Sequence, residues 1–400
     1  MIFKEMNELF QIVIPALIAI ICTGWIYPYI LDVAKAKNIV DNPDARKLQR
    51  VPVPVLGGLT VVFGILSGLM AFNLFGDFSD MFPAFATIII ILIIGLIDDM
   101  ISLSPRVRFV VEIILILYLI GTTGCQLNDF HGLWGLSVIP NYISVPLTVF
   151  ACVGIINAVN LIDGVDGYSS GYSIISCVLF GVMFYALGDI RMVTLAAIVA
   201  ASLLPFFLHN VFGKHSKMFI GDAGTLSLGI IFSVFVMTII SSSQNIDGLP
   251  TNLGLIPFTL AVLCVPVFDT LRVMSTRIVK GRSPFSPDKT HLHHLFLELG
   301  YSHIGSALSI ITINLFVVLC WFLAFRAGLS IDTQLYIVIV FGILVTFIFY
   351  PFVHVQIRRQ TLFYRILRRI ALFTHAERKG FWAVAQKWAD RSTHEEIKTL

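Results

Sequence analysis

The sequence predicts an all-α, polytopic integral membrane protein with about eleven transmembrane helices, an outside N-terminus and a cytoplasmic C-terminus. Two features of composition support this prediction. Of the 400 residues, 57% are hydrophobic and only 13% are charged, whereas soluble domains are about a quarter charged. The third observation is the length of the apolar runs, because about 20 residues are needed to cross the hydrocarbon of a bilayer. Composition therefore excludes an ordinary soluble globular domain.

Eleven apolar runs meet or approach the length of a span. They cover residues 8–30, 55–75, 83–98, 108–124, 143–162, 170–188, 191–209, 223–243, 253–273, 304–326 and 334–356. With the N-terminus outside, every one of the 27 Lys and Arg residues except Lys4, Arg191 and Arg326 falls inside. This asymmetry follows the positive-inside rule, and an even number of spans would leave part of it unexplained.

The chain is predicted to consist of a transmembrane domain over residues 1–356, with polar cytoplasmic loops, and a basic cytoplasmic tail over residues 357–400. Arginines alternate with Leu, Ile and Phe in the first part of the tail. This pattern is typical of an amphipathic helix on anionic lipid headgroups. A plain topology anchor is the simpler interpretation.

Polar residues gather where apolar runs reach the predicted inner face. The segment Asn157-Ala-Val-Asn160-Leu-Ile-Asp163-Gly-Val-Asp166-Gly167 follows the run 143–162, and its spacing of three keeps the first polar groups on one side of a helix. Asp98 and Asp99 end another run, where they repel each other and the negative end of the helix dipole. Such costly placements favour a cation or a proton-transfer role.

Three further loops at the same face carry basic, aromatic and imidazole groups. The loop 41–58 joins basic residues to the pair Gly57-Gly58, and the loop 217–225 places Phe219 and Asp222 between glycines. Asp222 could simply cap the helix that follows it. The largest cluster consists of Asp269, Arg272, Arg277, Lys280, Arg282, Asp288, Lys289, His291, His293 and His294. Its His spacing is weak for zinc, whereas Arg, Lys and His suit a diphosphate.

Taken together, these loops offer carboxylates for Mg²⁺, cations and imidazoles for phosphates, and an aromatic ring for a base. Oxygen ligands combined with substrate phosphates are the usual setting of Mg²⁺. The residues therefore predict phosphoryl-type transfer from a nucleotide compound to a lipid-borne acceptor.

At this point the motifs themselves match a family. The chain resembles the polyprenyl-phosphate N-acetylhexosamine-1-phosphate transferases, a superfamily of glycosyltransferase 4 type. Five ordered motifs carry the resemblance over about residues 8–325: Pro52-Val-Pro54-Val-Leu-Gly57-Gly58, Gly95-Leu-Ile-Asp98-Asp99, the Asn157–Gly167 segment, Phe219-Ile-Gly221-Asp222-Ala-Gly224, and Ser283-Pro-Phe-Ser-Pro-Asp288-Lys-Thr-His291-Leu-His293-His294.

The resemblance implies a Mg²⁺-dependent enzyme, with Mn²⁺ as an alternative ion. It would transfer an N-acetylhexosamine 1-phosphate, with GlcNAc-1-phosphate as the first candidate, from a UDP-sugar to undecaprenyl phosphate and release UMP. This would be the first membrane step of cell-surface polysaccharide synthesis, at the cytoplasmic side of the bacterial inner membrane. The implied partners are UDP-N-acetylhexosamine, undecaprenyl phosphate and membrane lipid, without nucleic acid, and a homodimer stays open.

The motifs also imply the catalytic and metal-binding residues. Asp98, Asp99 and Asp163 are the implied catalytic carboxylates, with Asp98 as the candidate proton acceptor. A phosphate monoester is already largely ionised at neutral pH, so the need for a base is small. Asn160 and Asp222 are the implied metal ligands.

The remaining implied residues bind the substrates. Phe219 and Asp166 would hold the uracil, and Asn157 would support the site together with Asp163. The side chains that would grip the diphosphate or the sugar are Arg50, Arg282, His291, His293 and His294. Gln49 stands where many relatives have His, so Arg50 is the nearer candidate for that role.

The Ser-Pro-Phe-Ser-Pro-Asp and His-Leu-His-His forms resemble the GlcNAc-type branch. A phospho-MurNAc-pentapeptide-type transferase is the alternative, and GalNAc or a deoxyaminosugar would also fit. A membrane transporter is a further alternative, but it would place polar groups near the bilayer midplane and often show a repeat. A lipid phosphotransferase of the CDP-alcohol type would carry the pattern Asp-Gly-x-x-Ala-Arg. This alternative lacks support, because Asp163-Gly164 is followed by Val-Asp-Gly-Tyr.

Overall fold

The computed structural model describes residues 2–42, 51–74, 79–244, 246, 248–284, 290–375 and 380–391, and of residues 2–7 the backbone alone. The described chain is mostly helical. Its α-helices are α1 (Ile2–Ala36), α2 (Gly57–Phe72), α3 (Phe82–Ile101), α4 (Pro105–Thr123), α5 (Asn141–Leu161), α6 (Tyr168–Ala186), α7 (Ile190–Phe212), α8 (Gly221–Ile239), α9 (Leu255–Val262), α10 (Cys264–Val279), α11 (Leu292–Glu298), α12 (His303–Arg326), α13 (Ile331–Ile343), α14 (Phe349–Arg359), α15 (Leu362–Phe373) and α16 (Phe381–Arg391). Short 3₁₀ turns η1 (Ser79–Met81) and η2 (Leu133–Gly135), a π-helical turn η3 (Leu344–Ile348), and an antiparallel pair of strands β1 (Val40–Asp41) and β2 (Val53–Pro54) complete it.

Within the described residues, eight helices are long and apolar enough to cross a membrane. They are Glu8–Ala36, Ser79–Ile101, α5, α6, α7, α8, α12 and Ile331–Arg359. Large apolar side chains such as Ile21, Phe150 and Val182 stay exposed on these helices, as expected of surfaces that face lipid. The predicted class, a mostly helical protein with several candidate membrane spans, is confirmed at this level.

The other three predicted spans also coincide with helices, but of a different kind. The run 55–75 forms α2, which has only 16 residues. The run 108–124 forms α4, whose first half carries Arg106, Arg108 and Glu112. The run 253–273 is divided between α9 and α10, which meet at a bend of 71°. The count of eleven spans therefore stays a prediction, as does the orientation of the termini.

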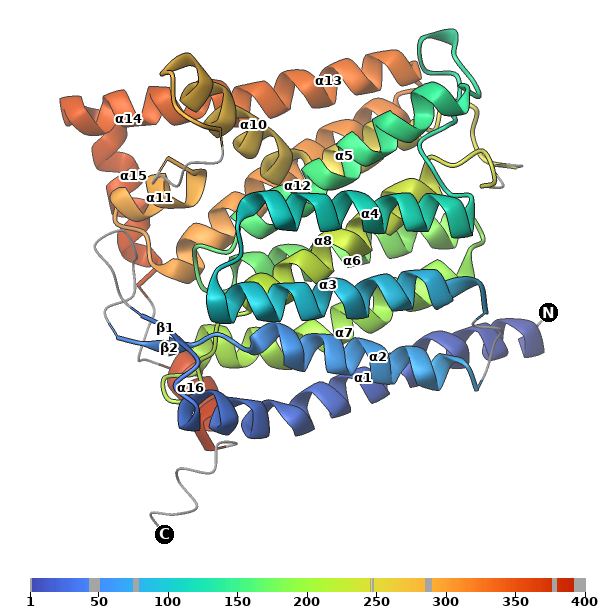
Figure 1. The fold of residues 1–400 in the computed structure, drawn as a ribbon. Helices are drawn as coiled ribbons and strands as arrows, with labels where there is room; N and C mark the ends of the chain where they lie inside the picture. The colour runs from blue at the N-terminus through green and yellow to red at the C-terminus, as the bar shows by residue number, and fades with distance from the viewer. Residues whose placement is uncertain are drawn as a thin grey trace. The chain divides into compact units, whose positions relative to one another are not determined.

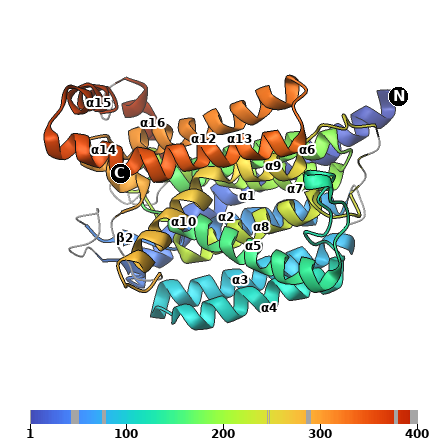
Figure 2. The same ribbon diagram turned by 90° about the horizontal axis from the view of Figure 1, so that it is seen from above.

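The chain divides into two compact units, and the first contains residues 1–124, 169–235 and 377–400. In this unit α1, α2 and α7 pack along one another, and α3 packs on α2 and α4. Figures 1 and 2 both show α3 and α4 as neighbouring helices. Gly64 and Gly68 allow α2 to approach its neighbours closely: a methyl group at Gly64 would lie 1.8 Å from Thr23 Oγ1, and one at Gly68 would lie 2.8 Å from Ile198 Cγ2.

The second unit contains residues 125–168 and 236–376. Here α12 packs against α9, α10 and α13, and α10 also crosses α5. Figure 2 shows α12 beside α13. Helix α11 lies against α12 and α14.

The bend between α9 and α10 has a local cause and a matching partner. Pro266 lies in the first turn of α10, and a proline lacks the N–H that would continue the hydrogen-bond ladder. Asn314 of α12 fills the break: its Nδ2 donates to the Val262 carbonyl at 2.9 Å, and its Oδ1 accepts from the Val265 N–H at 2.9 Å. One buried amide therefore satisfies the main-chain groups that the break exposes.

The tail forms two helices that belong to different units. The predicted amphipathic helix is present as α15, which buries Tyr364 and Ala371 while Leu362, Phe373 and Arg365 are exposed. Its contact with lipid headgroups stays a prediction. Helix α16 belongs to the first unit and packs against α7.

Candidate active site

Three of the five motifs meet in the first unit, and main-chain hydrogen bonds join two of them. The Gly57 and Gly58 N–H groups donate to the Phe219 and Ile220 carbonyls at 2.9 and 2.7 Å. In return the Phe219 N–H donates to the Pro54 carbonyl at 2.8 Å. The segment before α2 thus forms a short ladder with the segment before α8.

Glycines make this approach sterically feasible. A methyl group at Gly58 would lie 2.1 Å from the Gly224 nitrogen, and one at Gly95 of α3 would lie 2.4 Å from the Ala223 Cα. Gly221 adopts φ +68°, a conformation that favours glycine. The first turn of α8 is therefore held between the start of α2 and the end of α3.

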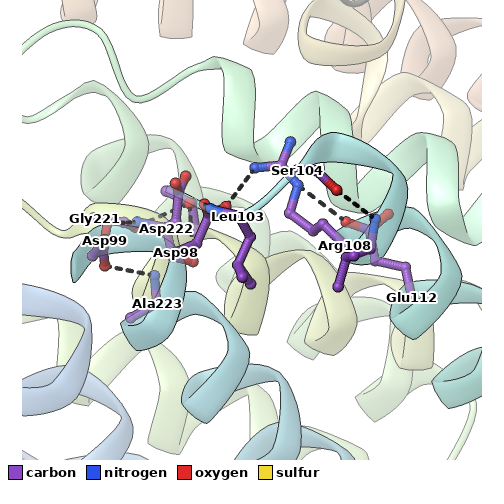
Figure 3. A network of polar contacts seen from close by, with 11 residues as sticks. Asp98, Asp99, Leu103, Ser104, Arg108, Glu112, Gly221, Asp222 and Ala223 are labelled. Carbon is purple, nitrogen blue, oxygen red and sulfur yellow. Dashed lines mark hydrogen bonds and ion pairs between the residues drawn. The ribbon is translucent and has the colours of Figure 1, made fainter. Parts of the chain in front are cut away.

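Asp99 fixes that turn from the end of α3. Its Oδ1 accepts the Asp222 N–H at 2.8 Å and its Oδ2 accepts the Ala223 N–H at 3.1 Å (Figure 3). The first amides of a helix lack partners within the helix, and a carboxylate is favoured there by the dipole. Asp99 therefore caps α8. The sequence had offered this role as an alternative for Asp222.

Asp98 is held by a cation and a main-chain amide. Its Oδ1 accepts the Leu103 N–H at 2.6 Å, and its Oδ2 accepts from Arg108 Nη1 at 3.2 Å (Figure 3). The Arg108 Nε lies 3.7 Å from Oε1 of Glu112, one turn along α4. A proton acceptor at Asp98 would have to act from within this charge network.

Asp222 lies in the first turn of α8, and Phe219 lies in the segment that leads into it. Both side chains are half-buried, and Lys217 Nζ lies 5.5 Å from the centroid of the Phe219 ring. Among the described residues, no group of three or more His, Cys, Asp or Glu side chains is arranged to hold a metal ion. The carboxylate oxygens here suit a metal ion whose remaining ligands are phosphate oxygens and waters.

The other two motifs meet in the second unit. A methyl group at Gly164 would lie 2.2 Å from His293 Nε2, so the imidazole packs directly on the 163–167 turn. The ring of Tyr168 lies 6.5 Å from that of His293. Asp166 Oδ2 lies 2.9 Å from Nδ1 of His303, the first residue of α12.

A buried carboxylate organises the basic side of this second cluster. Asp269 Oδ1 accepts from Arg272 Nη2 at 2.7 Å, and its Oδ2 lies 2.9 Å from His291 Nδ1 and accepts the Leu292 N–H at 3.2 Å. The guanidinium of Arg272 lies 4.0 Å from the centroid of the Tyr350 ring. Asp269 therefore orients both the guanidinium and the imidazole.

The three motif histidines lie close to one another, and two of them are stacked. The rings of His291 and His293 are parallel within 1° at 5.7 Å, and those of His293 and His294 lie 4.3 Å apart. Burial, followed by the neighbouring His294 and His291, holds the pKa of His293 well below its ordinary value of 6.5. His293 is thus a neutral ring at neutral pH.

The remaining predicted residues are placed as follows. Asn157 Nδ2 donates to the Val153 carbonyl of its own helix at 2.9 Å. Asn160 is half-buried at the end of α5, and Asp163 and Arg282 are exposed. Arg50 lies outside the described residues. Asn160 belongs to the second unit and Asp222 to the first, so their joint role as metal ligands stays a prediction.

Sequence reasoning placed Asp269 in the largest polar cluster without a role of its own, and it gave no site role to Arg108 or His303. For Arg108 a signal existed, because Glu112 follows it by four residues in an apolar run that the sequence predicts to span the membrane, where an unpaired Glu would be costly. Asp269 precedes Arg272 by three residues inside an apolar run, which is a similar signal. The contact of His303 with Asp166 spans 137 residues, and no local pattern indicates it.

Comparisons with known proteins agree with the motifs. Residues 81–240 match the profile of glycosyl transferase family 4. The decaprenyl-phosphate N-acetylglucosaminephosphotransferase of Mycolicibacterium smegmatis is 32% identical over 316 residues, which cover 74% of this chain and 76% of that protein. The chain belongs to glycosyl transferase family 4.

Two further relatives place this family 4 chain among similar enzymes. The decaprenyl-phosphate N-acetylglucosaminephosphotransferase of Mycobacterium leprae is 33% identical over 68% of this chain and 73% of its own length. The undecaprenyl-phosphate alpha-N-acetylglucosaminyl 1-phosphate transferase of Escherichia coli K12 is 29% identical over 68% of this chain and 72% of its own length. The predicted polyprenyl-phosphate N-acetylhexosamine-1-phosphate transferase family is confirmed.

Proposed function

We propose that the protein transfers GlcNAc 1-phosphate from UDP-GlcNAc to undecaprenyl phosphate and releases UMP. The observation that carries this proposal is the meeting of three motifs at the first turn of α8, which gathers Asp98, Asp99 and Asp222 at a helix N-terminus. Because Asp99 already occupies the Asp222 and Ala223 amides, the neighbouring carboxylates suit a divalent cation that in turn binds the phosphates. The names of the relatives supply the sugar and the lipid.

The reaction is a displacement at phosphorus. An oxygen of the lipid phosphate attacks the sugar-side phosphorus of the UDP-sugar, a new P–O bond forms, and the P–O bond to UMP breaks. Positioning and neutralisation of charge provide most of the catalysis in such transfers. Because the lipid phosphate is already largely ionised, Asp98 has little proton transfer to perform. Its pairing with Arg108 instead keeps a guanidinium at this end of α4.

Asp222 is the proposed metal ligand in the first unit, with Asn160 as the second protein ligand implied by the motif. Carboxylate and amide oxygens are the ligand types that Mg²⁺ prefers. A bound Mg²⁺ would supply electrostatic stabilisation of the diphosphate and the leaving UMP. Asp99 contributes indirectly, because it fixes the turn that carries Asp222.

The second cluster supplies the positive and neutral hydrogen-bond donors. Arg272 and His291 are both oriented by Asp269, and His294 is half-buried beside His293. Arg and His side chains donate strongly to phosphate oxygens. We assign His291, His293 and His294, together with Arg50 and Arg282, to the diphosphate or the sugar, with Arg272 as an added candidate, and Phe219 with Asp166 to the uracil.

We further propose eleven spans, with the N-terminus outside and the reaction at the cytoplasmic face of a bacterial inner membrane. The charge distribution supports this topology, because only Lys4, Arg191 and Arg326 would lie outside. In it α2, α4 and the bent pair α9–α10 add three spans to the eight apolar helices.

The test is an assay of purified full-length protein with radiolabelled UDP-GlcNAc, undecaprenyl phosphate and Mg²⁺. Labelled lipid and UMP should form in equal amounts, and EDTA should stop the reaction until Mg²⁺ or Mn²⁺ is restored. A parallel panel contains UDP-GalNAc and UDP-MurNAc-pentapeptide. A strong preference for UDP-MurNAc-pentapeptide would replace the proposed sugar, and no transfer from any donor would overturn the proposal.

A further inference from the structure

The last helix of the tail packs on the loop that leads into the Phe219–Asp222 segment. The ring of Phe212, at the end of α7, lies 4.7 Å from that of Trp382 and 6.1 Å from that of Phe381 in α16. His209, one turn earlier in α7, stacks on Trp388 with ring centroids 5.9 Å apart. These aromatic contacts seat α16 beside residues 213–218.

Several donors of this loop converge on the carboxylate oxygen Oδ1 of Asp390 in α16. The N–H groups of Lys214, His215 and Ser216 donate to its Oδ1 at 3.0, 2.9 and 3.1 Å, and the Ser216 hydroxyl lies 3.2 Å away. Three successive amides that converge on one point form an anion-binding nest. Asp390 is only 9% exposed, so these charge-assisted bonds are largely shielded from water.

Residues of α1 and α7 also hold this loop. The Tyr27 hydroxyl donates to the Ser216 carbonyl at 2.8 Å, and Asn210 Nδ2 donates to the Met218 carbonyl at 3.0 Å. Lys217, between these two anchor points, extends its ammonium toward the Phe219 ring. The conformation at Ser216 is therefore transmitted to Lys217 and Phe219 through only a few bonds.

We infer that Asp390 is a positioning residue, which holds the 214–216 turn so that Lys217 and Phe219 are presented to the nucleotide. This inference rests on the proposed function, in which Phe219 binds the uracil. Packing alone would need no carboxylate at this place, because an apolar side chain would cover the loop at lower desolvation cost. The tail is thus part of the donor-binding apparatus as well as a topological anchor.

The experiment compares Michaelis constants of full-length variants in detergent for the two substrates separately. Asp390→Ala removes the acceptor and should raise the KM for UDP-GlcNAc about tenfold, with the KM for undecaprenyl phosphate changed less than about twofold. Asp390→Asn keeps one acceptor oxygen and should give a smaller rise. Phe219→Ala is the benchmark and should raise the KM for the UDP-sugar more than that for the lipid.

Asp189→Ala is the matched control, because its carboxylate accepts the Met192 N–H at the opposite end of α7. It should change neither KM. An Asp390→Ala protein with an unchanged KM for UDP-GlcNAc, or with equal rises for both substrates, would overturn the inference. Should Asp390→Ala fail to fold, Asp390→Asn decides by the same criterion.

A second measurement separates this inference from the proposed function. Calorimetric titration with UMP requires no turnover, and Asp390→Ala should weaken UMP binding about tenfold. If the wild-type protein transfers no sugar phosphate, the proposed function fails, yet weaker UMP binding by the variant would still support the positioning role. Equal UMP affinities, or no binding by either protein, would refute it.

Discussion

The two clusters of motif residues are built in different ways. In the first unit the α8 turn is fixed through the main chain: Asp99 accepts two amides of this turn, and Gly58 and Gly95 let the segments touch. In the second unit side chains hold one another, with Asp269 at the centre. The first arrangement should therefore be sensitive to any added atom, and the second to the loss of a charge.

The most damaging single change is expected at Asp222. Asp222→Asn should lower turnover about a thousandfold, since a metal ion is worth several kcal/mol in such reactions, while the protein stays folded in detergent. Turnover and the melting temperature measure the two effects. Asp332→Asn is the control, because Asp332 also lies in the first turn of a helix. Normal turnover in folded Asp222→Asn protein would remove Asp222 from the metal site.

The close approach of main chains in the first unit is tested by adding one methyl group. Gly95→Ala places a carbon 2.4 Å from the Ala223 Cα, so the α8 turn must shift. We expect turnover to fall about a hundredfold and the melting temperature to decrease. Gly121→Ala on α4 is the control, because nothing lies within 4 Å of the added carbon. Equal behaviour of the two variants would contradict the proposed main-chain control.

The charge network of the second unit is tested at Asp269. Asp269→Asn keeps the shape but removes the charge that Arg272 and His291 share, and kcat/KM for the UDP-sugar should fall about tenfold. A double-mutant cycle with His291→Gln should be strongly non-additive, because the two residues are in contact. Additive effects would show that they act separately.

The smallest expected effect concerns pH and His293. The unfolded chain binds a proton at this residue near pH 6.5, whereas burial holds the pKa of His293 lower in the folded protein. The contribution of neutral His293 to the free energy of unfolding is therefore fully present above about pH 6.5. It decreases as the pH falls below this value, by up to about 1.4 kcal/mol per pH unit. Melting temperatures between about pH 8 and 5 should show this slope, with a smaller slope in His293→Gln. The exposed His215→Gln serves as the control, and an unchanged slope in His293→Gln would refute the assignment.

The helices followed directly from apolar length, because a span must bury its main-chain polar groups within itself. The run 83–98 lies inside Ser79–Ile101, and the run 304–326 matches α12 within one residue. The break near Leu263 was missed, although Pro266 within the run 253–273 was a local signal. Its partner Asn314 lies about fifty residues further on, and no periodicity reports such a contact.

Site residues were predictable by type but only partly by role. The adjacent carboxylates Asp98 and Asp99 indicated a functional site, but their interactions differ. Asp98 pairs with Arg108, whereas Asp99 accepts the main-chain amide of Asp222, 123 residues away. The sequence raised capping at the α8 turn only as an alternative role for Asp222, whereas Asp99 provides the cap. Capping by a residue from another helix depends on tertiary packing, which the local sequence does not contain.

The amide of Asn314 has a consequence for substrate recognition. It completes the hydrogen bonding on both sides of the α9–α10 bend, so the elbow is a rigid joint and not a hinge. Asp269 and Arg272 follow directly on α10, and their direction is settled when the protein folds. Ligand binding therefore does not bear the entropic cost of aligning them. A smaller side chain at position 314 is expected to weaken recognition, because it would loosen α10 only one to two helical turns before Asp269 and Arg272.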